Sequence, residues 1–123
     1  MNIPKGYQAV MPYLMMEDAA GFIEFTKDVF DAELTHHSVR DGIVGHCEIK
    51  IGGSTIMFSA SRGEWKPATA NMFVYVDDAD ARYKKAVEAG VETIMPPADQ
   101  EYGRSCGVTD PFGNVWWITS VIE

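Results

Sequence analysis

An internal repeat of about sixty residues constrains the fold of this chain more than any other feature. Gly53 and Gly113 stand sixty positions apart, and so do Met57 and Trp117. In each half a strand-like segment is followed by an acidic pair, a helical pattern and three further strand-like segments. The repeated order predicts an α+β fold built from two tandem βαβββ modules. Because one such module leaves a face of its sheet uncovered, we expect the two modules to pair.

Apolar spacing and turn residues locate the elements. Phe22 and Phe25 recur at helical spacing after Asp18, a residue type that often caps helix N-termini. Asp41-Gly42 and Gly52-Gly53 are typical of two-residue hairpin turns. The expected strands span residues 7–16, 33–40, 43–51, 54–59, 71–76, 92–95, 103–109 and 114–121, and the expected helices span 18–30 and 79–89. Together they form a single domain over residues 1–123, with module one at about 7–60, a linker at about 61–70 and module two at about 71–121.

The charge balance of the chain argues against some classes of binding partner. With 10 Lys and Arg residues against 18 Asp and Glu residues, the net charge is -8, which would repel a nucleic-acid backbone or an anionic membrane. The N-terminal residues lack the basic start and apolar core of a signal peptide, so we expect the protein in the cytoplasm. In that reducing compartment Cys47 and Cys106 should remain free thiols.

Motifs spread over nearly the whole chain form a recognisable pattern. They are Pro12-Tyr13-Leu14 with Glu17-Asp18-Ala19, Phe25 through Phe30, Val74-Tyr75-Val76-Asp77, and Asp110-Pro111-Phe112-Gly113-Asn114. In this pattern the chain resembles the vicinal oxygen chelate superfamily, the group of glyoxalases, bleomycin-resistance proteins and ring-cleaving dioxygenases. The resemblance implies modules that form an open, barrel-like cup, usually in a homodimer, with a small molecule bound in the cup. It also implies that the enzymes of the group hold a divalent metal that chelates two vicinal oxygens of the substrate.

The same resemblance assigns the family's metal ligands to four positions near the starts of the opening strands and on the last strand of each module. These positions hold Met11, Met57, Asn71 and Trp117. Divalent ions prefer carboxylate, imidazole or water, whereas a thioether is a soft ligand and an indole is not a ligand. The single amide oxygen of Asn71 is not enough to hold an ion. We therefore expect no metal and no other cofactor, and a divalent metal is the alternative.

Strand alternation indicates which side chains should line the cup. Every second residue of each opening strand faces away from the helix, and aromatic and Met side chains there would form a stacking surface for a planar or cationic guest. Core packing by the same side chains is the alternative. Arg104 could meet an anionic ligand or form an ion pair with nearby acids. The expected ligand-binding residues are Met11, Tyr13, Met15, Met57, Asn71, Phe73, Tyr75, Arg104 and Trp117.

A second, polar group of side chains follows from the hairpin turns. A two-residue turn at Asp41-Gly42 sets His37 opposite His46 and leaves His36 on the other face. Glu48 would then share the face of His37 and His46, where two imidazoles and a carboxylate could bind a metal or transfer a proton. The alternative is a set of half-exposed strand residues at the rim of the sheet. His37, His46 and Glu48 are the candidate catalytic residues.

Three functions are compatible with these observations. The first is metal-independent binding of a small planar or cationic drug or metabolite, sequestered in the aromatic-lined cup of a homodimer. The second is a metal-dependent lyase, isomerase or dioxygenase of the same superfamily that uses His37, His46 and Glu48. The third is a scaffold with a filled cup and only a dimerisation role. We favour the first, which leaves open whether the protein is an enzyme.

Overall fold

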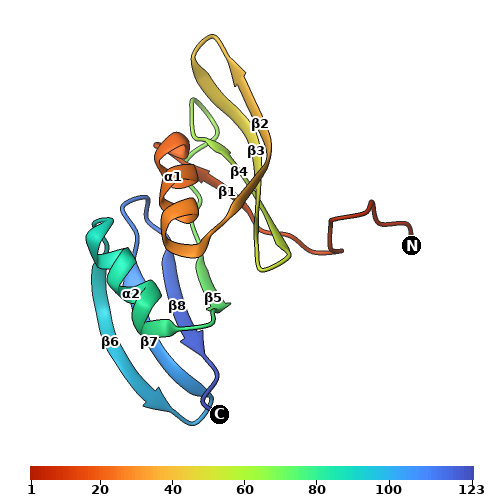
Figure 1. The fold of residues 1–123 in the computed structure, drawn as a ribbon. Helices are drawn as coiled ribbons and strands as arrows, with labels where there is room; N and C mark the ends of the chain where they lie inside the picture. Colours follow the sequence, from red (N-terminus) through yellow and green to blue (C-terminus); the bar gives the residue numbers. More distant parts are fainter.

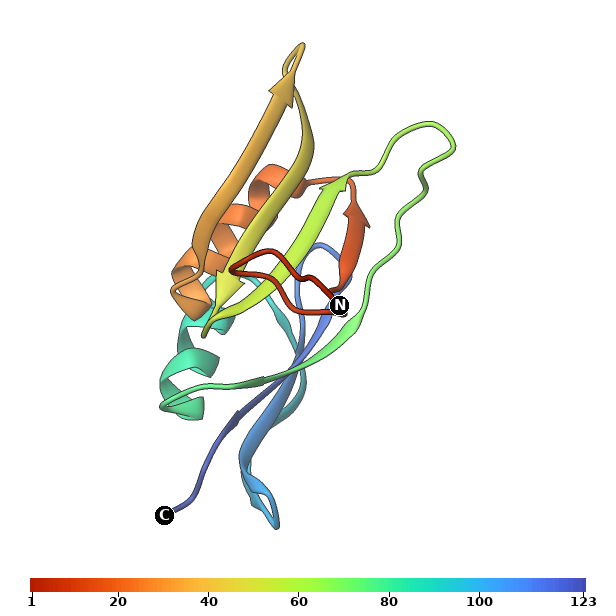
Figure 2. The same cartoon turned by 90° about the vertical axis from the view of Figure 1, so that its right-hand side faces the viewer.

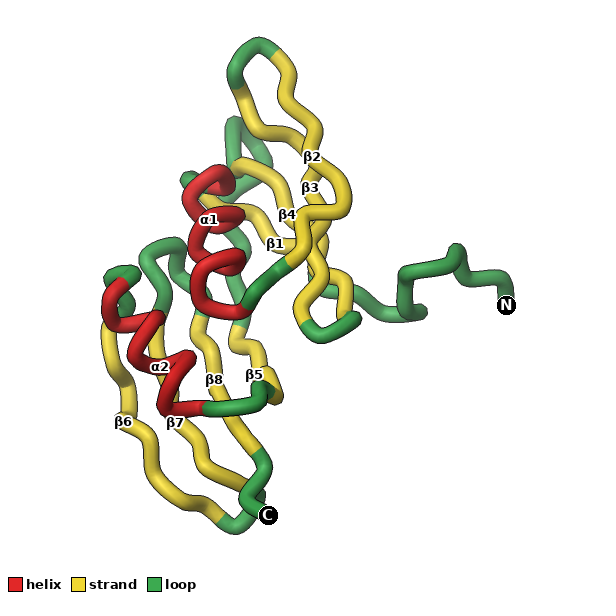
Figure 3. The backbone as a smooth tube through the Cα atoms, in the orientation of Figure 1, coloured by secondary structure: helices red, strands yellow, loops and turns green.

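The computed structural model describes all residues, 1–123, as two sheets that each carry one helix (Figures 1 and 3). The elements of the first module are β1 (Tyr13–Met16), α1 (Ala19–Phe30), β2 (Glu33–Arg40), β3 (Ile43–Ile51) and β4 (Ser54–Ala60), and those of the second are β5 (Asn71–Tyr75), α2 (Ala79–Glu88), β6 (Glu92–Gln100), β7 (Gly103–Thr109) and β8 (Val115–Ser120). Sheet one has the strand order β1-β4-β3-β2, and sheet two has the order β5-β8-β7-β6. In both sheets the opening strand is parallel to the closing strand, and the other pairs are antiparallel. The predicted α+β fold with two tandem βαβββ modules in an open cup is confirmed, since neither sheet closes into a barrel.

Both helices begin after an aspartate, as the sequence predicts. A carboxylate oxygen of Asp18 accepts from the Gly21 N–H at 2.8 Å, and one of Asp78 accepts from the Ala81 N–H at 3.2 Å. These bonds satisfy backbone donors that have no partner within the helix. Neither helix has the length and apolar character that crossing a membrane requires.

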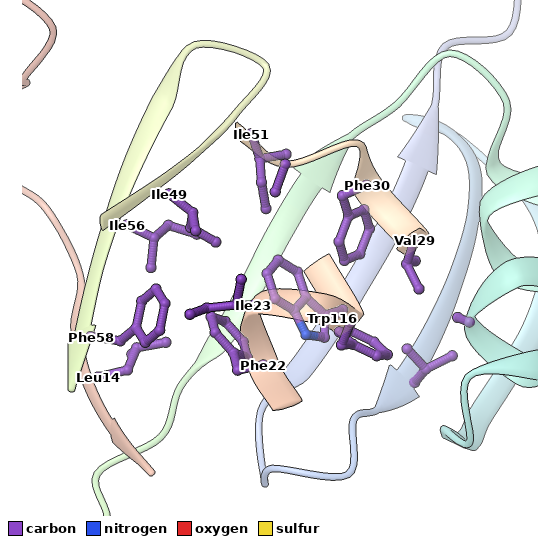
Figure 4. Packing of buried hydrophobic residues seen from close by; sticks show 14 of the residues in the cluster. Leu14, Phe22, Ile23, Val29, Phe30, Ile49, Ile51, Ile56, Phe58 and Trp116 are labelled. Atoms are coloured by element: carbon purple, nitrogen blue, oxygen red, sulfur yellow. The ribbon is translucent and has the colours of Figure 1, made fainter. Parts of the chain in front are cut away.

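The two modules meet through the helix-bearing faces of their sheets (Figure 4). Trp116 of β8 is 1% exposed, and its ring centroid lies 4.6 Å from that of Phe30 in α1. Phe22 of α1 contacts Trp116 and, on sheet one, Phe58 of β4. The two helices also pack against each other. A single hydrophobic core therefore runs from one module to the other, and it occupies the helix-bearing side of both sheets.

Residues of the Asp110–Asn114 turn form a buried hydrogen-bond network. Asp110 is 4% exposed, and its carboxylate accepts from the backbone N–H groups of Phe112 and Asn114 and, at 2.8 Å, from the Trp116 indole N–H. Asn114 in turn accepts from the backbone N–H of Ala70, where the linker meets β5. The turn thus positions the largest core side chain and the start of the second module, which explains the residue types of this motif.

We call the face of each sheet that carries no helix its outer face. The N-terminal residues 1–12 cross the outer face of sheet one, passing in front of β3 and β4 in Figure 2. Thr55 holds this segment, because its hydroxyl donates to the Gly6 carbonyl at 2.8 Å and its own carbonyl accepts from Gln8 Nε2 at 2.8 Å. The first strand therefore begins at Tyr13, later than the sequence predicted, because the preceding residues bond across the sheet.

The strand β6 is longer than expected. It continues past Met95 and through Pro96-Pro97 to Gln100, at the edge of sheet two. Its pairing with β7 shifts between Met95 and Ala98. Proline lacks a backbone N–H, so an edge strand with an irregular register is where a sheet tolerates it.

Candidate functional site

The outer face of sheet two carries an exposed aromatic surface. Phe73 and Tyr75 of β5 are 50% and 62% exposed, and their ring centroids lie 5.1 Å apart. Phe73 is paired with Trp117 of β8, so the indole lies on the same face. We call Asn71, Phe73, Tyr75 and Trp117 the aromatic platform. Tyr102, in the turn between β6 and β7, extends it, with a ring centroid 6.0 Å from that of Phe73.

The position of the Trp117 indole depends on a glycine. Gly107 of β7 is paired with Trp117, and a Cβ atom at Gly107 would lie 2.4 Å from the indole ring. The ring therefore lies directly over the Gly107 backbone. Its Nε1–H donates to Asn71 Oδ1 at 3.3 Å. The platform is thus ordered by close packing beneath Trp117 and by a hydrogen bond at its edge.

The outer face of sheet one carries polar groups instead. The Tyr7 hydroxyl donates to Glu48 Oε1 at 2.5 Å, and His46 Nε2 lies 2.6 Å from Glu48 Oε2. His46 Nδ1 lies 2.9 Å from the Tyr13 hydroxyl. We call these four residues, in the order Tyr7–Glu48–His46–Tyr13, the polar chain. Because each polar atom of the chain has a partner, it can hold an ionised carboxylate away from water.

The environment of Glu48 favours its ionised form. Burial of this residue, which is 7% exposed, raises its pKa, but the hydrogen bonds from Tyr7 and His46 outweigh burial and bring the pKa below its ordinary value. The same carboxylate raises the pKa of Tyr7, which must donate to a negative group. Glu48 is therefore an anion at neutral pH, with both oxygens engaged.

The position of His37 is a correction to the sequence prediction. The Asp41-Gly42 hairpin forms as expected, but the register of β2 and β3 shifts on both sides of the His36–His37 pair. As a result His36 faces Glu48, its ring centroid 5.4 Å from that of His46, while His37 pairs with Cys47. His37 thus lies away from the polar chain. For the same reason His36, expected on the opposite face, lies on the outer face with Glu48.

The structure places the Met candidates on sheet one. Met57 pairs with both Tyr13 and Glu48, two members of the polar chain. Met11 and Met57 line a recess of about 380 Å³ under the N-terminal segment. Met15 follows Tyr13 by two residues on β1, and its backbone bonds to Ala68 of the linker at 2.9 Å.

Arg104 does not face the aromatic platform, contrary to expectation. Its guanidinium bonds Asp80 of α2 at 2.8 Å and Asp99 at 3.0 Å, which places it on the helix-bearing side of β7. These two carboxylates raise its pKa further above an already high ordinary value. The ion pair with nearby acids, the alternative considered from the sequence, is the arrangement found.

Within one chain no aromatic contact joins the two outer faces. Aromatic contacts on the outer faces join residues of the same sheet, such as Tyr13 with His46 and Phe73 with Tyr75. The aromatic contacts between modules lie on the helix-bearing side, such as Phe30 with Trp116. The expected ligand-binding residues of the two sheets therefore form two separate groups within one copy.

A recess does form where the sheet edges approach each other. It measures about 370 Å³ and is bordered by Phe73 and Tyr75 of the aromatic platform. From module one it receives Gln8, Ile51 and Thr55 among others. The recess extends the apolar surface of the platform and adds a few polar groups to it.

The candidate metal positions do not suit a divalent ion. Met11 and Met57 offer thioethers, and the Asn71 oxygen already accepts from Trp117. No three His, Cys, Asp or Glu side chains are grouped to hold a metal ion. The residues present therefore do not fit the metal that the family resemblance implies.

The two cysteines do not form a reactive site. Both are free and buried. Burial raises the pKa of Cys106 to about 11 and also raises that of Cys47. Because the thiolate is the reactive form, both residues act as small core side chains.

Comparison with known proteins agrees with this geometry. Residues 8–118 match the family model of the Glyoxalase/Bleomycin resistance protein/Dioxygenase superfamily. An uncharacterized protein of Mycobacterium bovis is 32% identical over 121 residues, which cover 88% of this chain and 80% of that protein. TioX from Micromonospora sp. ML1 has a similar structure, with a TM-score of 0.77 at 20% identity, over 94% of this chain and 99% of TioX. The fosfomycin resistance protein FosX from Mesorhizobium loti gives a TM-score of 0.69 at 16% identity, over 98% of this chain and 95% of FosX.

The model match covers most of the sequence, and the two tandem modules with their open sheets are the fold that these structures share. The chain belongs to the Glyoxalase/Bleomycin resistance protein/Dioxygenase superfamily.

Proposed function

We propose that this protein binds a small planar or cationic molecule, a drug or a metabolite, on the aromatic platform and without a metal ion. The observation that carries the proposal is the ordered exposure of the platform: Phe73 and Tyr75 are at least half exposed, and the Trp117 ring packs closely over Gly107. Large apolar side chains gathered on a surface mark a binding site more often than isolated ones. Their rings offer faces for stacking and for cation–π contact.

Charge and shape support the choice of ligand. The net charge of -8 attracts cations and repels anions at long range. The adjoining recess of about 370 Å³ falls within the range of ligand pockets and is lined mainly by apolar groups, with Gln8 and Thr55 as polar contacts. A flat cation that stacks on Phe73 could extend into it.

We propose further that a homodimer completes the cup. Each chain uses its helix-bearing faces to join its own modules, which leaves the two outer faces for a second copy. If sheet one of one copy covers sheet two of the other, Tyr13 and Met57 would lie over Phe73 and Trp117. Such pairing would line one open cup with the exposed aromatic rings of one copy and with Tyr13 of the other, so that both stay accessible to a small molecule. The free thiols Cys47 and Cys106 suit the cytoplasm that we propose as its location.

Tryptophan fluorescence tests the binding site directly. In a Trp65→Phe background, which removes the exposed indole of the linker, we expect saturable quenching by 9-aminoacridine, a planar cation. Trp117→Phe should remove the quenching, whereas the anion 9-anthracenecarboxylate should bind at least about 10-fold more weakly because of the net charge. Linear, non-saturating quenching in all variants would mean that the platform binds nothing and that dimerisation is its only role.

Removal of metal separates the proposal from the metal-dependent alternative. Dialysis against a chelator should leave the 9-aminoacridine affinity unchanged, because none of the platform residues is a metal ligand. A loss of binding that Zn²⁺ or Mn²⁺ restores would favour the metal-dependent enzyme. Light scattering during size exclusion, with and without the ligand, checks the homodimer.

A further inference from the structure

We propose that Tyr13, His46 and Glu48 form a nucleophile–base–carboxylate triad that transfers acyl groups from small esters through the Tyr13 hydroxyl. This activity goes beyond the binding proposed above and does not rest on it, because it uses the outer face of sheet one alone. The Tyr13 oxygen lies 2.9 Å from His46 Nδ1, and His46 Nε2 lies 2.6 Å from Glu48. A hydroxyl within reach of an imidazole that a carboxylate orients is the arrangement that activates a hydroxyl nucleophile.

The partners of His46 determine where its proton sits. The Glu48 carboxylate is ionised and can only accept, so His46 Nε2 must be the N–H that donates to it. In the neutral ring this leaves the lone pair of Nδ1 facing the Tyr13 hydroxyl, which donates to it. Tyr7 donates to the second oxygen of Glu48 and prevents the carboxylate from turning away. The hydrogen bonds of the polar chain therefore leave His46 Nδ1 as the proton acceptor that faces the Tyr13 hydroxyl.

Exposure decreases along the triad in the order that catalysis requires. Tyr13 is 46% exposed, the His46 side chain 33% and the Glu48 side chain 9%. The hydroxyl can thus reach a substrate, while the carboxylate is shielded from water and acts strongly on the imidazole. Met57 lies beside Tyr13 and lines the recess of about 380 Å³ under the N-terminal segment, which offers an apolar place for the acyl or aryl group.

The reaction balances without any further reagent. The Tyr13 oxygen attacks the ester carbonyl carbon as its proton moves to His46 Nδ1, and the bond to the leaving alcohol breaks as that alcohol takes the proton. Water then attacks the acyl-tyrosine in the same way, with His46 again as the base, and the acid leaves while the Tyr13 hydroxyl is restored. Glu48 stabilises the imidazolium in both steps and is a positioning residue.

Reaction with 4-nitrophenyl acetate tests the triad on the full chain. We expect release of 4-nitrophenolate with an acetyl group on Tyr13, located by peptide mass spectrometry. Acetylation of Tyr13 should be at least about 10-fold faster than that of N-acetyltyrosinamide in the same solution, since a positioned base contributes this much or more. This comparison needs no variant, so it holds even if a substitution prevents folding.

Matched variants assign the roles. His46→Gln should lower Tyr13 acetylation at least about 10-fold, whereas His37→Gln, on the same hairpin but away from the polar chain, should leave it unchanged. In Glu48→Gln the rate should also fall, and ¹⁵N NMR should show that His46 has lost its preference for a proton on Nε2. Acetylation of His46 itself with Tyr13 unmodified, a Tyr13 rate equal to that of N-acetyltyrosinamide, or an equal Tyr13 rate in His46→Gln would each overturn the proposal.

Discussion

The outer faces of the two sheets are built on equivalent strand pairs but carry different kinds of side chain. In sheet one Met57 of β4 pairs with Glu48 of β3, and in sheet two the equivalent Trp117 of β8 pairs with Gly107 of β7. The carboxylate is linked with an imidazole and two hydroxyls in the hydrogen-bonded polar chain, whereas the glycine leaves space for an indole to pack over the backbone. The residue at one position of the neighbouring strand thus decides whether the face is polar or aromatic.

The helix-bearing faces show no such contrast, because both contribute apolar side chains to one core. In both halves of the repeat the helix-bearing faces carry the apolar side chains of the shared core, whereas the side chains of the exposed faces differ. A binding surface and a hydrogen-bonded triad can therefore occupy matching places in one small protein without disturbing its core.

Removal of the carboxylate should have the largest effect on sheet one. Glu48→Ala leaves Tyr7 and His46 without the acceptor they share and opens a gap on the face, so we expect a loss of about 3 kcal/mol in the free energy of unfolding. Urea unfolding at pH 7 measures it. Glu33→Ala, at an exposed position on β2, is the control and should cost less than about 0.5 kcal/mol. Equal effects of the two substitutions would show that the polar chain does not stabilise the fold.

The corresponding change on sheet two adds an atom where there is no room. Gly107→Ala would place a Cβ 2.4 Å from the Trp117 indole, so the ring must move, at a cost of about 2 kcal/mol in the free energy of unfolding. The matched control is Gly45→Ala in β3, whose Cβ would meet its nearest atom at 3.5 Å. We expect a shifted Trp117 emission spectrum and weaker 9-aminoacridine binding for Gly107→Ala alone. An unchanged spectrum would mean that the indole does not lie over the glycine.

Much of the fold could be predicted from the sequence because local chemistry encodes it. The Asp18 and Asp78 caps and the hairpin at Asp41-Gly42 depend on residues close together in the chain, and the sixty-residue repeat shows the same local pattern twice. The Asp110 turn also satisfies its bonds locally, apart from the contact of Asn114 with Ala70. Where the structure depends on contacts between distant segments, prediction was weaker.

The candidate site contains residues whose positions could not be predicted from the sequence. A shift in the β2–β3 register, which no turn residue signals, exchanges His36 for His37 on the outer face. Tyr7 joins Glu48 across 41 positions of sequence, so its part in the polar chain could not be read from spacing. Strand alternation identifies which side chains point away from a helix, but not how the outer faces of the two sheets are placed relative to each other.

Lowering the pH should change the stability that the outer face of sheet one contributes through Glu48. The folded chain holds the pKa of Glu48 below its ordinary value of 4.5, so this residue stabilises the fold above that pH. Its contribution is lost as the pH falls through the lower pKa of the folded state, where the carboxylate takes up a proton. Glu48→Gln cannot titrate, so the stability difference between the wild type and Glu48→Gln should shrink toward acid pH. Urea unfolding from pH 7 to pH 3 checks this, and a difference that grows on acidification would contradict it.

The smallest effect is expected at the edge of the aromatic platform. Asn71 accepts one hydrogen bond from the Trp117 indole, 3.3 Å long and exposed, so Asn71→Ala should lower the free energy of unfolding by only about 0.5 kcal/mol. Loss of one polar group would then matter much less on sheet two than on sheet one, since packing over Gly107 holds the indole. Urea unfolding and Trp117 emission measure the effect, with Asn2→Ala in the exposed N-terminal segment as the control. A cost near that of Glu48→Ala would mean that the aromatic face also depends on a polar contact, and the contrast between the two faces would fail.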